Sequence, residues 1–269
     1  MDETCGRLQR SAVHSSTRCF LRVSGPAQSF SHALGDTYQA GLWQGNLCCE
    51  LLWEMSDAEL LRDDYRPHAE SLPSLLAHLK DTKTCYSPFR SWVSRPAKIT
   101  YYRCKGLKED HFHQEVLSLD SRTTVTGLNP FGEVSVGIIC LQAEVTRLEL
   151  EAEIKKPDSR RRLGTESREF RTKGCIATSV FDCFVDDATL NSTEILLVLI
   201  GKTTHWYKNA LGLIICPSPS TASFRQQFCL QDELLWVRIG VFSIRAEHNS
   251  GNDPGQFFEN CEIRSLTLV

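Results

Sequence analysis

Few residues in this 269-residue chain have both the type and the spacing that a reaction needs. The string GKTT at residues 201–204 resembles the end of a phosphate-binding loop. Such a loop also needs a glycine five positions before Gly201, where this chain has Leu196, so the glycine-rich backbone that wraps phosphates is missing. We therefore interpret GKTT as the end of a strand that passes into a turn.

Two other groups could take part in chemistry. The string HFH places His111 and His113 on the same face of an extended segment, which is how a metal site can begin, but no third ligand is evident nearby. Asp186 and Asp187 could act as paired acids, although two turn-forming aspartates are the simpler interpretation. We predict no catalytic residue, no metal ligand, no cofactor and no cofactor-binding residue, and thus a protein that is not an enzyme.

The twelve cysteines bear on the cellular compartment. The chain has no C-x-x-C pair, Cys48 and Cys49 are adjacent, and the first residues lack the apolar stretch of a secretory signal. We predict free, mostly buried thiols in a reducing compartment, which favours a cytoplasmic location. The basic string KKPDSRRR within residues 155–174 resembles a short nuclear-localisation tract, so the nucleus is the alternative; a solvated loop is the preferred interpretation.

Charge and hydropathy limit the classes of partner. The formal net charge is −3, and the basic residues at 155–174 are mixed with acids and lack aromatic residues that could stack on bases, so we expect no nucleic acid partner. The longest apolar run, residues 195–200, is far shorter than the ~20 residues that a membrane-spanning helix needs, so we expect no membrane partner. No small-molecule substrate is identified.

The elements that must position these residues are helical at the N-terminal end. We expect disorder over residues 1–17 and a helical segment over residues 18–84. A short helix begins at Pro26 and ends at Gly35, where a glycine is favoured. A second helix covers residues 36–53, begins at Asp36 as its cap, and has a broad apolar face. A third short helix covers Leu72–Lys80.

Residues 85–269 form a predicted β-rich domain, with the basic loop at 155–174. Residues 133–143 and 146–154 are expected to be two strands that pair through a short connection near Ala143. Residues 98–104 and five later apolar strings also have the composition of strands, with few helices between them. The predicted fold is mainly β with a small α-helical N-terminal portion (α+β), and its body is an antiparallel β-sandwich or barrel.

Five strings, taken in order, resemble the C-terminal region of fungal heterokaryon-incompatibility (HET) proteins. SGPAQSFSHALGDTYQAGLWQGNLCCELLW is similar to their S-G-x-A…G-D-x-Y-x-A-G-L-W…L-L-W stretch, and SPFRSWVS to A-P-S-W-S-W-A-S, with Arg90 and Val93 as departures. NPFGEVSVGIICLQAEV, LGLIICPS and WVRIGVF resemble the later strings. The signature residues, which we expect to be structural, are Gly35, Asp36, Tyr38, Ala40, Gly41, Leu42, Trp43, Trp53, Trp92, Phe131, Gly132, Arg238, Gly240 and Phe242.

The resemblance covers only the region downstream of the HET domain, whose own Toll-like strings do not occur in these residues. It implies a non-catalytic module linked to non-self recognition or incompatibility signalling, with a HET-domain protein or a second copy of itself as partner. Two alternatives stay open: a truncated or degenerate product without an independent function, and a β-sandwich enzyme or ligand-binding module with an unrecognised site.

Overall fold

The structure is a computed structural model that describes residues 16–55, 71–80, 99–101, 111–125, 128–129, 131, 134–148, 167–172, 175–183, 185–204, 208–219, 234–246 and 254–269. The predicted disorder of residues 1–17 lies outside these ranges, except for Ser16 and Thr17, which begin the first helix.

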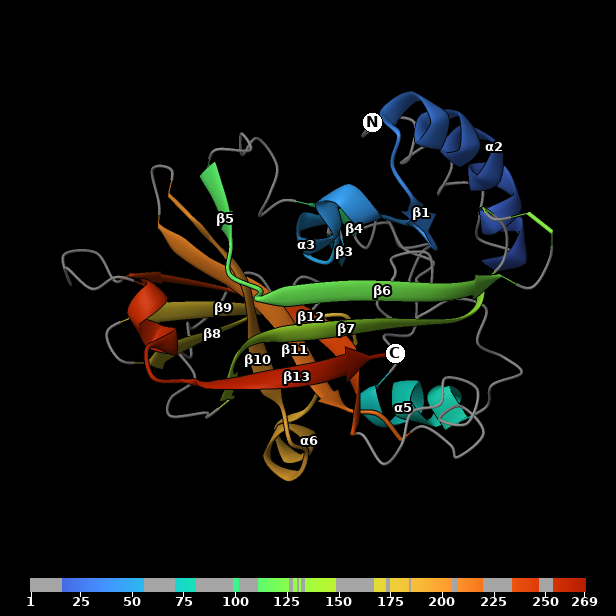
Figure 1. Cartoon of the computed structure of the whole chain (residues 1–269). Coiled ribbons are helices and arrows are strands. Elements are labelled where there is room, and N and C mark those ends of the chain that lie inside the picture. The colour runs from blue at the N-terminus through green and yellow to red at the C-terminus, as the bar shows by residue number, and fades with distance from the viewer. Residues whose placement is uncertain are drawn as a thin grey trace, which may run out of the picture.

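The chain is mainly β, with a small helical part near its N-terminus (Figure 1), as the sequence predicts. The helices are α2 (Ser16–Leu34), α3 (Leu47–Glu50), α5 (Leu72–Lys80) and α6 (Asp187–Ser192), with 3-10 turns η1 (Gln44–Asn46) and η4 (Pro254–Phe258). The strands are β1 (Tyr38–Gln39), β2 (Leu42–Trp43), β3 (Glu54–Met55), β4 (Ile99–Thr100), β5 (Phe112–Gln114), β6 (Ser118–Val125), β7 (Val134–Arg147), β8 (Ser167–Thr172), β9 (Cys175–Phe181), β10 (Leu196–Thr203), β11 (Asn209–Pro217), β12 (Leu235–Ala246) and β13 (Glu262–Leu268).

Nine strands form one mixed sheet that curls into a barrel-like body. Five of them lie in the order β11-β10-β7-β13-β12, and a pairing between β11 and β12 closes this order into a ring. Closure removes free edges, which would otherwise attract other strands. Among the described strands, β12 and β13 alone run parallel, where Leu235 pairs with Thr267. The sequence predicts the barrel-like body but not this parallel pair.

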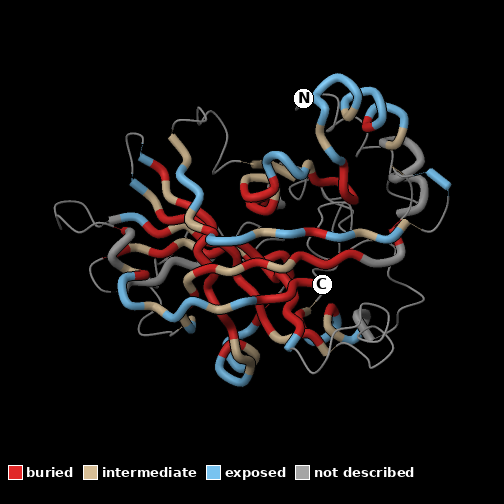
Figure 2. Tube along the Cα trace, viewed as in Figure 1, coloured by how far each residue is buried: buried red, intermediate tan, exposed pale blue. Residues whose placement is uncertain are grey.

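The central strands are buried on both faces (Figure 2). Along β10, Leu196 and Val198 belong to one apolar cluster and Leu197 and Leu199 to a second. The first cluster joins β7, β10, β11 and β13 to residues 42–53, and the second joins the other face of the sheet to α5. Burial on both faces explains why these strands are continuous apolar runs rather than alternating ones.

Two predicted boundaries are wrong. Residues 133–143 and 146–154 do not form a hairpin at Ala143, because β7 continues through that residue to Arg147; Ala143 is fully buried and pairs with Arg264. Residues 149–154 lie outside the described residues. The predicted basic loop over 155–174 includes a strand, β8, whose Arg171 pairs with Ile176 of β9.

The other predicted elements are confirmed where the structure describes them. Helix α5 has the predicted bounds, and the five later strings form β9 to β13. The string at 98–104 contributes β4. Within the described residues, no helix is both long enough and apolar enough to cross a membrane.

Candidate functional site

The signature residues begin where helix α2 ends. Gly35 ends the helix as predicted: its φ of 65° is left-handed, and its N–H donates to the Ser31 carbonyl at 2.9 Å. The predicted start at Pro26 is wrong, because the helix extends back to Ser16 and contains Pro26 in its interior. The periodic apolar residues mark the part of the helix that could be recognised, and not its full length.

Residues 36–53 do not form the predicted helix. Tyr38 pairs with Trp43 and Gln39 with Leu42 in a two-stranded hairpin. The two residues between the strands, Ala40 and Gly41, have φ values of 53° and 98°. A two-residue turn with positive φ at both positions matches the twist of the strands that it joins. A helix needs negative φ throughout, so the Ala-Gly turn overrides the helical spacing of the apolar residues.

Asp36 caps a turn instead of a long helix. Its Oδ1 accepts a hydrogen bond from the N–H of Thr37 at 2.7 Å and another from the N–H of Gly45 at 2.9 Å. A Cβ at Gly45 would lie 3.0 Å from the Asp36 Oδ2, which is tighter than most real contacts. The predicted role of Asp36 as the cap of a helix is therefore wrong, because its carboxylate instead accepts from an N–H of the 3-10 turn η1 that follows the hairpin.

The end of this segment meets the barrel at a buried charge. Arg238 of β12 is fully buried; its Nη2 donates to the carbonyl of Trp53, and its guanidinium lies 3.6 Å from the centroid of the Trp53 ring. On its other side, Nη1 lies 3.0 Å from Oδ2 of the buried Asp182, which follows β9. One guanidinium thus joins residue 53 to two strands of the barrel. Sequence analysis identifies Trp53 and Arg238 as signature residues, but it does not identify Asp182 as a partner of Arg238.

Gly240 and Phe242 of β12 act in strand packing. A Cβ at Gly240 would lie 2.4 Å from the Val180 carbonyl oxygen, so a larger residue would separate β12 from β9. Phe242 is fully buried and stacks on Phe258 with ring centroids 5.9 Å apart. It also lies over Gly212, where a Cβ would come within 2.6 Å of its ring. These contacts support the expected structural role of the R-x-G-x-F string.

A smaller aromatic group holds the hairpin. The ring of Tyr38 lies 5.3 Å from that of Trp43 and 6.0 Å from that of Phe131, measured between centroids. Gln39 reaches the main sheet, where its Nε2 donates to the Ser121 carbonyl at 3.5 Å. The hairpin is therefore packed on β6 and not extended into solvent.

Glu50 is an ionisable residue of this segment that sequence reasoning missed. Its Oε2 accepts a hydrogen bond from the Tyr101 hydroxyl at 2.9 Å, which connects α3 to the residue after β4. Burial raises the pKa of Glu50 to about 7; the hydrogen bond from Tyr101 lowers this pKa, and the nearby Asp36 carboxylate raises it. No motif marks the pair, because the two residues are far apart in the sequence.

The structure brings most of the signature residues together. Residues 35–53, Phe131 and Arg238 are joined by the contacts above, and Gly240 and Phe242 follow Arg238 on the same strand. Trp92 and Gly132 lie outside the described residues.

The other chemical candidates stay apart. His111 and His113 border and form part of the short strand β5, and within the described residues no three His, Cys, Asp or Glu side chains gather as metal ligands. Asp186 caps α6, accepting from the Thr189 N–H at 2.6 Å. The described cysteines outside α2 are free thiols. Burial raises the pKa of Cys48 and of Cys216 to about 12, so both are protonated at neutral pH and poor nucleophiles.

No family model, curated protein or solved structure matches this chain. Its class is therefore defined by its own geometry: a barrel-like β domain onto which residues 35–53 are fixed through a buried arginine.

Proposed function

We propose that this chain is a non-catalytic module of a heterokaryon-incompatibility-like protein, which packs beside a HET domain and takes part in non-self recognition. The observation that supports this proposal is the contact between Trp53 and Arg238, because it joins two of the strings that carry the resemblance. Strings that are distant in sequence but act as one assembly fit a shared structural role. The ionisable residues in them hold the assembly together: Asp36 caps a turn and Arg238 pairs with Asp182.

The surface for a HET domain is the outer side of residues 43–46. Gln44, Gly45 and Asn46 are exposed, Trp43 is half-buried, and the segment behind them is fixed to the barrel. A rigid surface loses little conformational entropy on docking, which suits a domain interface within one signalling assembly.

The test is binding to a purified HET domain from an incompatibility protein that lacks its own downstream region. We expect a micromolar Kd by isothermal titration calorimetry, and we expect Asn46→Arg to weaken binding about tenfold, equivalent to roughly 1.4 kcal/mol. The matched control is Ser192→Arg, since Ser192 is exposed on α6, which lies on the opposite side of the barrel from α3 (Figure 1). Absence of binding, or equal loss in the two variants, would contradict the proposal.

A further inference from the structure

Two buried polar atoms lie where the β1–β2 hairpin meets strand β6. Gln39 of β1 and Ser121 of β6 are each only 8% exposed. The Nε2 of Gln39 donates to the Ser121 carbonyl at 3.5 Å, which is longer than a usual N–H···O bond. Within the part of the chain that the structure describes, neither the Oε1 of Gln39 nor the Oγ of Ser121 hydrogen-bonds to a protein group. The contact therefore leaves an acceptor and a hydroxyl unsatisfied on the two residues that meet there.

The surroundings of these atoms are apolar. Ser121 lies opposite Ile139 of β7, and Gln39 lies opposite Leu42 of β2. Opposite residues in antiparallel strands project to the same face, and both Ile139 and Leu42 belong to the first apolar cluster. A buried oxygen without a partner is costly in such surroundings, and native proteins satisfy nearly all such groups.

The chemistry of the two atoms defines what can satisfy them. Only the NH2 group of the Gln39 amide can donate to the Ser121 carbonyl, and turning the amide over would place two acceptor oxygens against each other. The Oε1 of Gln39 therefore needs a donor, whereas the Ser121 hydroxyl can donate and accept. A ligand that bonds to both must be small, uncharged and able to donate an O–H, and water has all three properties.

We propose that the contact between the β1–β2 hairpin and β6 binds one water molecule, which donates to the Oε1 of Gln39 and shares a hydrogen bond with the Oγ of Ser121. Buried waters typically make roughly two to four hydrogen bonds to groups that are otherwise unsatisfied. The water gives the hairpin a second link to the main sheet, between residues 82 positions apart in the sequence. The inference does not depend on the proposed docking of a HET domain.

The first test is a crystal structure of the full chain at a resolution that shows ordered water. We expect one water oxygen at about 2.7–3.2 Å from both the Gln39 Oε1 and the Ser121 Oγ. Two results would overturn the proposal: a Ser121 hydroxyl that bonds directly to a protein group, or no water within hydrogen-bond distance of both atoms.

A double-mutant cycle followed by urea denaturation tests the same site in solution. Ser121→Ala removes the hydroxyl, and Gln39→Met replaces the amide by an apolar side chain of similar length. Each change should lower the equilibrium constant of folding about tenfold, which corresponds to roughly 1.4 kcal/mol, because it leaves the other oxygen and the water with fewer partners. The double variant should lose clearly less than the product of the two single losses, because it retains neither oxygen.

The matched control is Ser118→Ala, since Ser118 is exposed on the same strand. This change should leave the equilibrium constant of folding within about twofold, and its effect should simply multiply with that of Gln39→Met. Multiplicative losses for Ser121→Ala and Gln39→Met would contradict a water shared by the two residues.

Discussion

Arg238 connects residues that lie far apart in the sequence, Trp53 and Asp182. It is a fully buried charge that faces an aromatic ring, a carbonyl and a carboxylate. The desolvation of Arg238 and Asp182 is offset only while these partners are in place. The pair therefore adds little net stability when complete, but the loss of one member leaves the other charge buried and alone.

Arg238→Met should lower the free energy of unfolding by about 3–5 kcal/mol, because it leaves the Asp182 carboxylate buried without its cation. Urea denaturation measures this change. The control is Arg122→Met: the Arg122–Asp120 pair is exposed, so its loss should cost at most about 1 kcal/mol. Adding Asp182→Leu to Arg238→Met should recover much of the loss. Equal costs for Arg238→Met and Arg122→Met would show that the buried pair is not a special contact.

Glu50 should make stability depend on pH near neutrality. Burial raises its folded-state pKa to about 7, from an ordinary value of 4.5, so the folded state holds this proton more tightly than the unfolded state. The stabilisation is complete below the unfolded pKa and is lost as pH rises through about 7. Above that pH the ionised carboxylate stays partly buried, and its desolvation costs stability.

Glu50→Gln should therefore match the parent protein at pH 5 but exceed its free energy of unfolding at pH 8, by on the order of 2 kcal/mol. Urea denaturation at both pH values is the measurement. Glu262→Gln is the control. The hydrogen bond from Arg264 lowers the pKa of the exposed Glu262, so the free energy of unfolding of this variant, relative to the parent protein, should not increase with pH. A Glu50→Gln effect that is the same at pH 5 and pH 8 would rule out the titration of this carboxyl.

At the scale of elements, the Ala40–Gly41 turn decides between the predicted helix and the observed hairpin. Gly41→Ala puts a Cβ on a residue with a φ of 98° and should cost about 1–2 kcal/mol of unfolding free energy. In a helix the same change would stabilise by ~1 kcal/mol. The control is Gly25→Ala in α2, where a Cβ meets nothing within 4 Å; the following Pro26 offsets the helical gain, so little change is expected. A stabilising Gly41→Ala would contradict the hairpin.

The sequence predicts elements best where burial and period agree. The strands β9 to β13 and helix α5 follow from apolar runs of the right length and composition. The prediction of a helix over residues 36–53 is wrong because the spacing of Tyr38, Leu42 and Trp43 matches a helical stripe by coincidence. The positive φ angles of Ala40 and Gly41 fix the hairpin instead. The break expected at Ala143 fails because a change from an apolar to an alternating pattern marks a change in burial, not the end of a strand.

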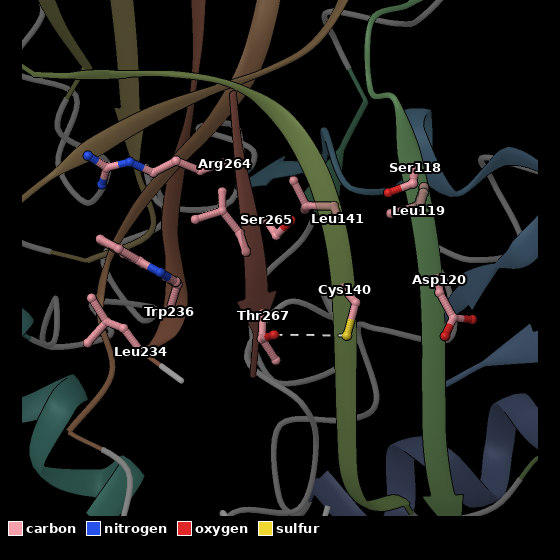
Figure 3. A pocket seen from close by; sticks show the side chains of 11 residues that line it. Ser118, Leu119, Asp120, Cys140, Leu141, Leu234, Trp236, Arg264, Ser265 and Thr267 are labelled. Carbon is pink, nitrogen blue, oxygen red and sulfur yellow. Dashed lines mark hydrogen bonds between the residues drawn. The ribbon is translucent and has the colours of Figure 1, made fainter. Parts of the chain in front are cut away.

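The sequence identifies only some of the residues of the candidate site. Trp53 and Arg238 stand out through the strings that contain them, yet their contact joins residues 185 positions apart. Asp182 and the Glu50–Tyr101 pair carry no motif. A hollow lined by Trp236 is built from four segments, at β6, β7, β13 and the start of β12, that meet only in the closed barrel (Figure 3). Long-range partners depend on register and closure, which local patterns do not encode.

For the whole molecule, the question is whether residues 35–53 and the barrel unfold together. Leu47, Cys48 and Leu51 share one apolar cluster with strands β7, β10, β11 and β13, and Arg238 ties Trp53 to the barrel. Cys216 of β11 belongs to the second cluster, on the other face of the sheet. Separate release of the segment would remove Trp53 from the Arg238–Asp182 pair and would expose the apolar surface of the first cluster to water. Local opening should therefore be nearly as costly as global unfolding.

Cys48 and Cys216 should therefore become reactive at the same urea concentration. Both thiols are buried with pKa values of about 12, so neither should react with iodoacetamide in the native protein. Mass spectrometry of pulse-labelled peptides gives a midpoint for each, and the half-buried Cys140 is the control that labels earlier. Labelling of Cys48 well before Cys216 would mean that the segment opens as its own unit. Its packing would then be a conformational switch, and residues 43–46 would no longer be the rigid surface that docking of a HET domain requires.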